Sequence, residues 1–284
     1  MPTWNIEFKI HAPIKLHQSL HRQTRSAIKV ANEDSIITTN ITLREAPNER
    51  NVRYGYFSVI FTVSASTQKK ALDAGKVYAS QLCDLLSFIT RVSAQPEIDE
   101  DSRNTVNPRS RFAPTADRLL LAEEWDWIIR SLANLNLKEP QLMAACSWYR
   151  RGLCCDDVTE KICCYWRVIE RCAISCCNEL GTDGYIKIIP TVDKFIKEYI
   201  SKPCALLANK KNWKEVYSLR NIISHGSEPL SPRLIDKCSS YEEETEEAAY
   251  CALSNVIAEL SKKELFLGLN LQSNEDYIEE MDRL

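Results

Sequence analysis

The chain has 284 residues, of which 44% are hydrophobic and 26% are charged, a balance typical of a globular protein that can bury a core. Its formal net charge is −3, so no overall positive field indicates a nucleic-acid partner, and a polyanion would have to meet a local basic patch. No uncharged apolar run approaches the roughly 18 residues that a membrane span needs. The first residues also lack the apolar segment of a secretory signal. We therefore expect a cytoplasmic protein with no membrane partner.

Residues 1–92 predict a small β-sheet followed by one long helix. Every second residue from 4 to 10 is apolar, which is the pattern of a strand with one buried face. Residues 35–44 and 54–64 are rich in β-branched and aromatic side chains, as strands are. Between residues 66 and 89, apolar side chains recur at helical spacing and face a polar side rich in lysine. This part of the chain therefore forms an α+β domain.

Residues 93–116 differ in composition from both sides of the chain. They are polar, contain three prolines and show no periodicity, which indicates a linker or an extended surface loop. Beyond them the pattern becomes helical, and caps, opening prolines and closing glycines agree with it. The helices that we expect cover residues 117–134, 141–153, 158–180, 190–200 and 211–224, with at least one more in 229–265. The fold class is therefore α+β, with an all-α bundle over residues 117–284.

The 12 cysteines lie mostly in the helical half, and they allow two interpretations. Cys172 and Cys176 are four residues apart on one helix face, as two metal ligands could be. However, the chain contains no CxxC pair, and a tetrahedral zinc site usually gathers ligands from two elements. Cysteine is also a small and readily buried residue. We therefore expect reduced cysteines that fill the core, with no metal and no cofactor.

The most informative segment runs from Tyr217 to Gly226 and holds Arg220, Asn221 and His225 near a helix end. Positions five apart in a helix differ by roughly 140° about its axis, so a straight helix would not direct Arg220 and His225 to one point. A glycine that ends a helix permits a left-handed cap. We expect this cap at Gly226 to let the imidazole swing toward Arg220.

These side chains suit the chemistry of phosphodiesters. His225 can act as a general base or acid on a ribose 2′-hydroxyl, Arg220 can bind a phosphate through two hydrogen bonds, and Asn221 can orient either group. The ribose hydroxyl is an internal nucleophile, so the reaction needs no metal. In the alternative interpretation Arg220 pairs with a helix carboxylate and His225 merely ends the helix. Glu170 is the candidate carboxylate, and it would either orient the arginine or neutralise it.

The stretch Arg220–His225, RNIISH, matches the R-[polar]-x3-H signature of HEPN domains. Gly226 and the upstream helical residues 164–170 also look like this superfamily. The chain resembles in particular the ApeA-like HEPN proteins and the group known as methylamine utilisation proteins, which likewise have an α+β part before their helices. The resemblance covers residues 117–265, whereas the N-terminal half matches in outline.

This resemblance implies a HEPN-like bundle of four to five helices that often dimerises. The family's typical activity is metal-independent RNA cleavage in toxins, antiviral defence effectors and RNA-processing factors, while many members are non-catalytic interaction or nucleotide-binding modules. Carried over to this chain, Arg220 is the phosphate binder, Asn221 its polar neighbour and His225 the acid–base residue. The implied partners are RNA and a second copy of the helical domain. The N-terminal domain would then sense a trigger or bind a protein partner.

A basic and aromatic stretch precedes the motif on the same predicted helix. Lys210, Lys211 and Lys214 could bind the phosphates of single-stranded RNA, and Tyr217 could stack on a base. Trp213, Tyr217 and Arg220 share one stripe of this helix. The alternative is that both aromatic side chains belong to the core and that the lysines form a solvated face.

Overall fold

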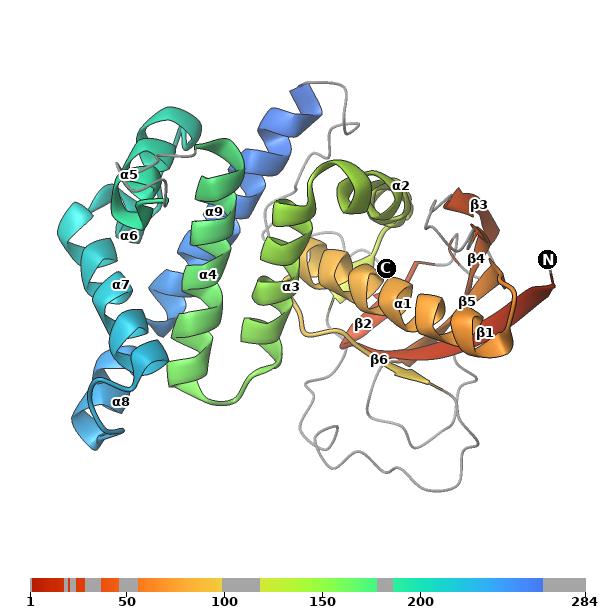
Figure 1. The fold of residues 1–284 in the computed structure, drawn as a ribbon, viewed down its shortest axis with the longest axis horizontal. Coiled ribbons are helices and arrows are strands. Elements are labelled where there is room, and N and C mark those ends of the chain that lie inside the picture. Colours follow the sequence, from red (N-terminus) through yellow and green to blue (C-terminus); the bar gives the residue numbers. More distant parts are fainter. Residues whose placement is uncertain are drawn as a thin grey trace. The chain divides into compact units, whose positions relative to one another are not determined.

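The computed structural model has the α+β fold that the sequence predicts (Figure 1). It describes residues 2–17, 20, 24–28, 37–45, 56–98, 118–177 and 186–262. The described residues divide into two compact units, one up to Asn134 and the other from Leu135 onward. The division falls within α2 (Ala122–Lys138), whereas the sequence places the start of the helical domain at residue 117.

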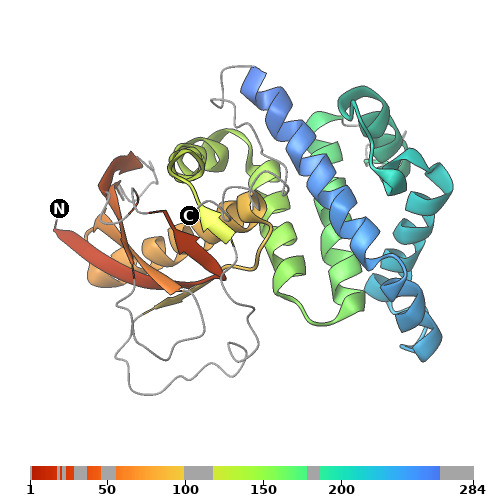
Figure 2. The same ribbon diagram turned by 180° about the vertical axis from the view of Figure 1, so that it is seen from behind.

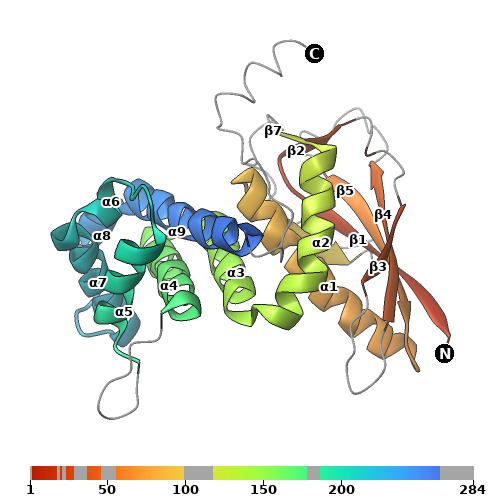
Figure 3. The ribbon, with the colours of Figure 1, turned by 90° about the horizontal axis from the view of Figure 1, so that it is seen from above.

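The first unit is built on a sheet with the strand order β3-β4-β5-β1-β6, in which all neighbours are antiparallel. The strands are β1 (Thr3–His11), β3 (Thr24–Ile28), β4 (Ile37–Glu45), β5 (Tyr56–Ser64) and β6 (Gln95–Ile98). Helix α1 (Gln68–Thr90) lies along one face, as Figures 1 and 3 show. Phe8 packs edge-on against Phe61 at 5.8 Å between ring centroids, and both rings are buried.

Three of the five strands in this sheet are the predicted ones, whereas β3 and β6 were not predicted. The segment from 93 onward, expected to be a linker, begins with β6, which pairs with β1 through His11 and Gln95. Most of the remaining linker residues lie outside the described part of the chain. Strand β2 (Ile14–Leu16) pairs in parallel with β7 (Arg118–Leu120). The helix predicted from residue 117 therefore begins later, at Ala122, because the residues before it form β7.

The second unit is a bundle centred on α4 (Val158–Cys176). The other helices are α3 (Pro140–Cys154), α5 (Ile188–Tyr199), α6 (Ala205–Ala208), α7 (Lys210–His225), α8 (Pro232–Ser239) and α9 (Glu242–Lys262). Figures 1 and 3 show α3 on one side of α4, with α5 and α7 on the other. In Figure 2 the long α9 crosses α3 and α4. Because helices surround it, α4 buries five consecutive side chains, those of residues 162–166, which point to different sides of the helix.

Capping residues determine where the two central helices begin and end. Asp157 accepts hydrogen bonds from the backbone N–H groups of Thr159 and Glu160 at the start of α4, as predicted for a cap. Helix α4 ends at Cys176, four residues earlier than predicted. Helix α7 ends at Gly226, which has the left-handed conformation with φ 60° and ψ 32°. Its N–H and that of the next residue close the last turn, so the predicted glycine cap is confirmed.

Most of the cysteines, which lie mainly in this unit, are small core residues. All 12 are free thiols, and more than half are buried, including Cys163, Cys164 and Cys172. Burial raises the pKa of the Cys172 thiol well above its ordinary value, so that side chain is neutral. No group of three His, Cys, Asp or Glu side chains gathers as metal ligands would within the described residues. None of the helices described is both long and apolar enough to cross a membrane.

Candidate functional site

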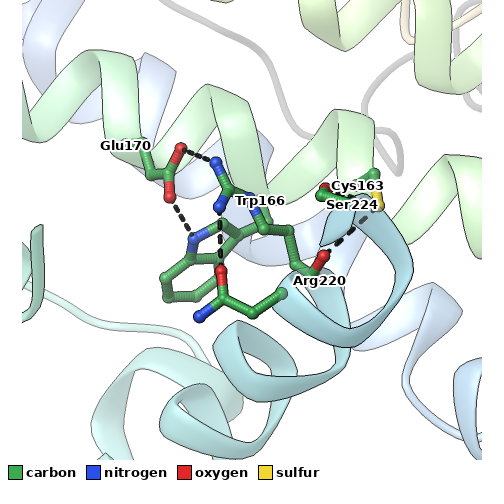
Figure 4. Close-up of polar contacts among 6 residues, drawn as sticks. Cys163, Trp166, Glu170, Arg220 and Ser224 are labelled. Carbon is green, nitrogen blue, oxygen red and sulfur yellow. Dashed lines mark hydrogen bonds and ion pairs between the residues drawn. The ribbon is translucent and has the colours of Figure 1, made fainter. Parts of the chain in front are cut away.

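Arg220 extends from α7 toward α4 and is held there by two side chains. Its Nη2 donates to Glu170 Oε2 at 3.0 Å, and its Nη1 donates to Asn221 Oδ1 at 2.9 Å (Figure 4). Only 20% of the Arg220 side chain and 10% of the Glu170 side chain are exposed. The ion pair suggested by the sequence is therefore present, and it is shielded from most of the solvent.

Glu170 joins the arginine to the core of the bundle. Its second oxygen, Oε1, accepts a hydrogen bond of 2.8 Å from Nε1 of Trp166, one turn earlier on α4. Burial raises the pKa of Glu170, and the positive charge of Arg220 and the bond from Trp166 oppose that shift. The charged state of this carboxylate therefore depends on Arg220. The role of Trp166 was not predicted, although its spacing of four residues from Glu170 on one helix would have allowed it.

The guanidinium of Arg220 still has unused hydrogen-bonding capacity. Its Nε is buried and has no hydrogen-bond partner among the residues that the structure describes. A guanidinium carries five N–H donors, and buried donors are nearly always satisfied. An oxyanion is the ligand that such a group binds best, since it can accept from two N–H groups at once.

Aromatic rings from α4 and α7 form the wall beneath this arginine. Trp166 stacks on Trp213 with ring centroids 6.2 Å apart, and Tyr217 lies 5.6 Å from Trp166. Trp213 is 1% exposed, so it belongs to the core and does not stack on a base. Tyr217 remains half-buried, with its ring against Trp166. Of the two predicted aromatic contacts, Tyr217 alone has surface left for a ligand.

His225 contrasts with Arg220 in its surroundings. It is the last residue of α7 and is exposed, and no hydrogen bond or ion pair to another described residue involves it. The swing toward Arg220 that the sequence suggested is not observed. The left-handed residue is Gly226, which follows His225, so His225 itself keeps the helical backbone and the direction that it imposes. Within one copy of the chain, the side chains of Arg220 and His225 therefore do not form a shared site.

The three lysines lie toward the other end of α7. Lys210 makes an ion pair of 2.8 Å with Asp193 of α5, whereas Lys211 and Lys214 are exposed. Lys214 precedes Arg220 by six residues and His225 by 11, which corresponds to roughly 9 Å and 16 Å along the axis. A nucleotide at His225 would therefore not contact them, although a longer strand could.

The chain was compared with models of known protein families, with curated proteins and with solved structures, and none of them matches it. The HEPN resemblance therefore rests on the residues of the motif and on the helices that carry it.

Proposed function

We propose that the helical unit cleaves RNA without a metal ion, with Arg220 binding the phosphate and His225 transferring protons. The observation that carries this proposal is the state of Arg220. Glu170 and Asn221 hold its guanidinium in place through two of its N–H groups, and 20% of the side chain remains exposed. An arginine that is oriented but not saturated is suited to stabilising the charge that develops on a phosphate.

In the proposed reaction the ribose supplies the nucleophile. The imidazole of one His225 removes the proton of the 2′-hydroxyl, whose oxygen then attacks the adjacent phosphorus. The bond from phosphorus to the 5′-oxygen breaks, and a second imidazole returns a proton to that leaving oxygen. The products are a 2′,3′-cyclic phosphate and a 5′-hydroxyl. Arg220 stabilises the additional negative charge on the phosphate oxygens during the attack.

The second imidazole would come from another copy of the chain. One copy does not bring Arg220 and His225 together, because they leave α7 roughly 140° apart. A two-fold axis beside the end of α7 would gather two arginines and two histidines around one phosphate, and two-fold dimers are the commonest symmetric assembly. We propose this homodimer as the active unit, acting in the cytoplasm as a defence or toxin effector, with the N-terminal unit binding a trigger or a protein partner.

The Glu170–Arg220 pair also favours a second candidate function. A carboxylate that already neutralises the arginine weakens its attraction for phosphate, as suits a non-catalytic interaction or nucleotide-binding module. Glu170→Gln separates the two candidates. If Glu170 orients Arg220 for catalysis, the variant cleaves more slowly. If Glu170 only neutralises Arg220, the variant binds RNA more tightly and still does not cleave it.

The direct test incubates the purified protein with a mixture of RNAs in EDTA and maps the ends of the products. We expect cleavage that leaves 2′,3′-cyclic phosphates and disappears in His225→Ala. Ser227→Ala, a truncation at an exposed position two residues further along, is the matched control and should cleave normally. A requirement for Mg²⁺ or products with 5′-phosphates would contradict the mechanism. RNA binding without any cleavage would favour the non-catalytic module.

A further inference from the structure

Two guanidinium groups lie over the ring of one tryptophan on the surface of the helical unit. Arg151, one turn after Trp148 on α3, has its Cζ 4.6 Å from the ring centroid of Trp148. Arg167 of α4 approaches the same ring, with its Cζ at 4.2 Å. Arg151 is exposed, while Trp148 and Arg167 are half-exposed. We refer to these three residues as the Trp148 cluster.

The two arginines of this cluster have no ion-paired carboxylate partner among the described residues. Neither Arg151 nor Arg167 makes an ion pair or a side-chain hydrogen bond with any other described residue, unlike Arg220 and Arg118, which pair with glutamates. The aromatic face of Trp148 attracts each guanidinium and restrains it. The N–H groups at the edge of each guanidinium remain exposed to solvent. Two like charges are therefore held near each other with their donors unused, an arrangement that an anion would stabilise.

The cluster adjoins the motif through α4. Arg167 precedes Glu170 by three residues on α4, so the two side chains leave neighbouring positions on one face of the helix. The charge of Arg167, like that of Arg220, also opposes the rise in the pKa of Glu170 that burial causes. Arg171, one turn after Arg167, is bound by the neutral amide of Gln141 at 2.9 Å and keeps its charge as well. On α4 the carboxylates near Arg167 are Glu170, which pairs with Arg220, and Glu160, roughly 10 Å before Arg167 along the helix, against the four arginines Arg151, Arg167, Arg171 and Arg220. Positive charge therefore prevails from Trp148 to Arg220.

We propose that the Trp148 cluster binds the phosphodiester backbone of single-stranded RNA and directs the strand toward Arg220. A guanidinium donates two parallel hydrogen bonds to one phosphate, and a strand provides successive phosphates for both arginines. This inference rests on the proposed function for the direction of the strand, whereas the binding itself requires no cleavage. The Trp148 cluster also supplies the local basic patch that the net charge of −3 does not provide.

Binding of a fluorescently labelled single-stranded RNA to the full-length chain, measured over a range of salt concentrations, tests the proposal. All proteins carry His225→Ala so that the RNA stays intact. The variant Arg151→Gln/Arg167→Gln removes both charges of the Trp148 cluster. Its control, Lys202→Gln/Arg233→Gln, removes two exposed charges elsewhere in the same unit. The variant Arg151→Lys/Arg167→Lys keeps both charges but removes the planar guanidinium groups, which can each donate two parallel hydrogen bonds to one phosphate.

The glutamine double variant should bind more weakly at low salt. The slope of log K against log salt should fall by about 1.4, because each phosphate of a single strand that a protein neutralises contributes about 0.7 to it. The control should keep the parent slope. The lysine variant should keep most of the slope and bind less tightly, and this result remains informative if the glutamine variant does not fold.

Two results would overturn the proposal. One is a glutamine variant that folds and keeps the parent slope. The other is displacement of the RNA by polyglutamate as readily as by unlabelled RNA, which would assign the cluster to an acidic protein partner. RNA cleavage by the parent chain, which keeps His225, is measured separately. The proposed function and this inference can therefore fail independently of each other. A slope that depends on the cluster without any cleavage refutes the proposed function alone, and cleavage with an unchanged slope refutes this inference alone.

Discussion

Arg220 and His225 stand five residues apart on one helix, and they occupy opposite environments. Arg220 is mostly shielded and is bonded to Glu170 and Asn221, whereas His225 is exposed and makes no polar bond within the described chain. The difference shows that the two halves of the motif are not equivalent. Arg220 serves the fold as well as any chemistry, while the fold makes no use of the imidazole of His225.

The arrangement of the helices produces this contrast. Arg220 leaves α7 on the side where α4 supplies Glu170, and Trp166 completes the hydrogen bonding of that carboxylate. His225 lies one and a half turns later, where Gly226 ends the helix. Substitutions at the two positions should therefore differ in their effects, changing both stability and activity at Arg220 and only activity at His225.

His225→Ala should produce the largest effect, and on activity alone. Loss of a proton-transfer group lowers a rate by about 10²–10⁴. Because the side chain is exposed and unbonded, the free energy of unfolding should change by no more than about 0.5 kcal/mol. Single-turnover cleavage and urea unfolding of the same preparation measure both quantities. A variant that cleaves like the parent would show that His225 is not the acid–base residue.

Arg220→Gln should destabilise the protein by about 2–4 kcal/mol at neutral pH, because it leaves the carboxylate of Glu170 shielded without its cation. Burial raises the pKa of Glu170 above its ordinary 4.5, and removing Arg220 should raise it further. A carboxyl group with a raised pKa in the folded state contributes stability that is present below its ordinary pKa and lost as the pH rises through the folded value. The cost should therefore be smaller at about pH 5 than at about pH 7.5.

The double variant Glu170→Gln/Arg220→Gln is the control for this explanation. It removes both charges and keeps an acceptor for Trp166, so it should recover much of the lost stability. Its stability should also lack the pH dependence that the unpaired Glu170 carboxylate gives to Arg220→Gln. Urea unfolding at the two pH values measures all three proteins. A cost of Arg220→Gln that does not change with pH, or that the second substitution does not relieve, would show that the pair does not stabilise the bundle.

Gly226→Ala should have the smallest of these effects, about 1 kcal/mol of unfolding free energy. The backbone at Gly226 has φ 60°, which costs a side chain about this much, and an added Cβ would meet nothing within 4 Å. Asparagine tolerates this conformation better, so Gly226→Asn should cost less than Gly226→Ala. Thermal unfolding measures both variants. Equal costs for both would indicate that the glycine is required for a reason other than its backbone angle.

Local signals in the sequence predicted the features of the fold that local chemistry determines. Asp157 and Gly226 cap their helices as expected, because each cap depends on a few neighbouring residues. Strand β6 was not predicted, because its polar, proline-containing sequence becomes a strand only by pairing with β1, more than 80 residues away. The start of α2 was misplaced for the same reason, since β7 pairs with β2 near the N-terminus.

The candidate site divides in the same way. The Glu170–Arg220 pair could be predicted because Glu170 shares its helix with Trp166 and so was expected to point into the bundle. The ion pair between Lys210 and Asp193 could not, because it joins two helices whose relative positions the sequence does not show. The sequence allowed Trp213 to be either a core residue or part of an RNA-binding stripe. Its burial beside Trp166 shows that it is a core residue. The Trp148 cluster was missed because Arg167 comes from another helix.

The central claim is that two copies of α7 share one phosphate, and a titration of mixed dimers tests it most directly. Increasing amounts of His225→Ala chain are added to a constant amount of the parent, with time for subunits to exchange, and RNA cleavage is measured in EDTA. The account predicts that cleavage per parent chain falls as mixed dimers form, and that it also falls when the parent alone is diluted. Cleavage that is proportional to parent concentration and indifferent to the added variant would contradict the shared site.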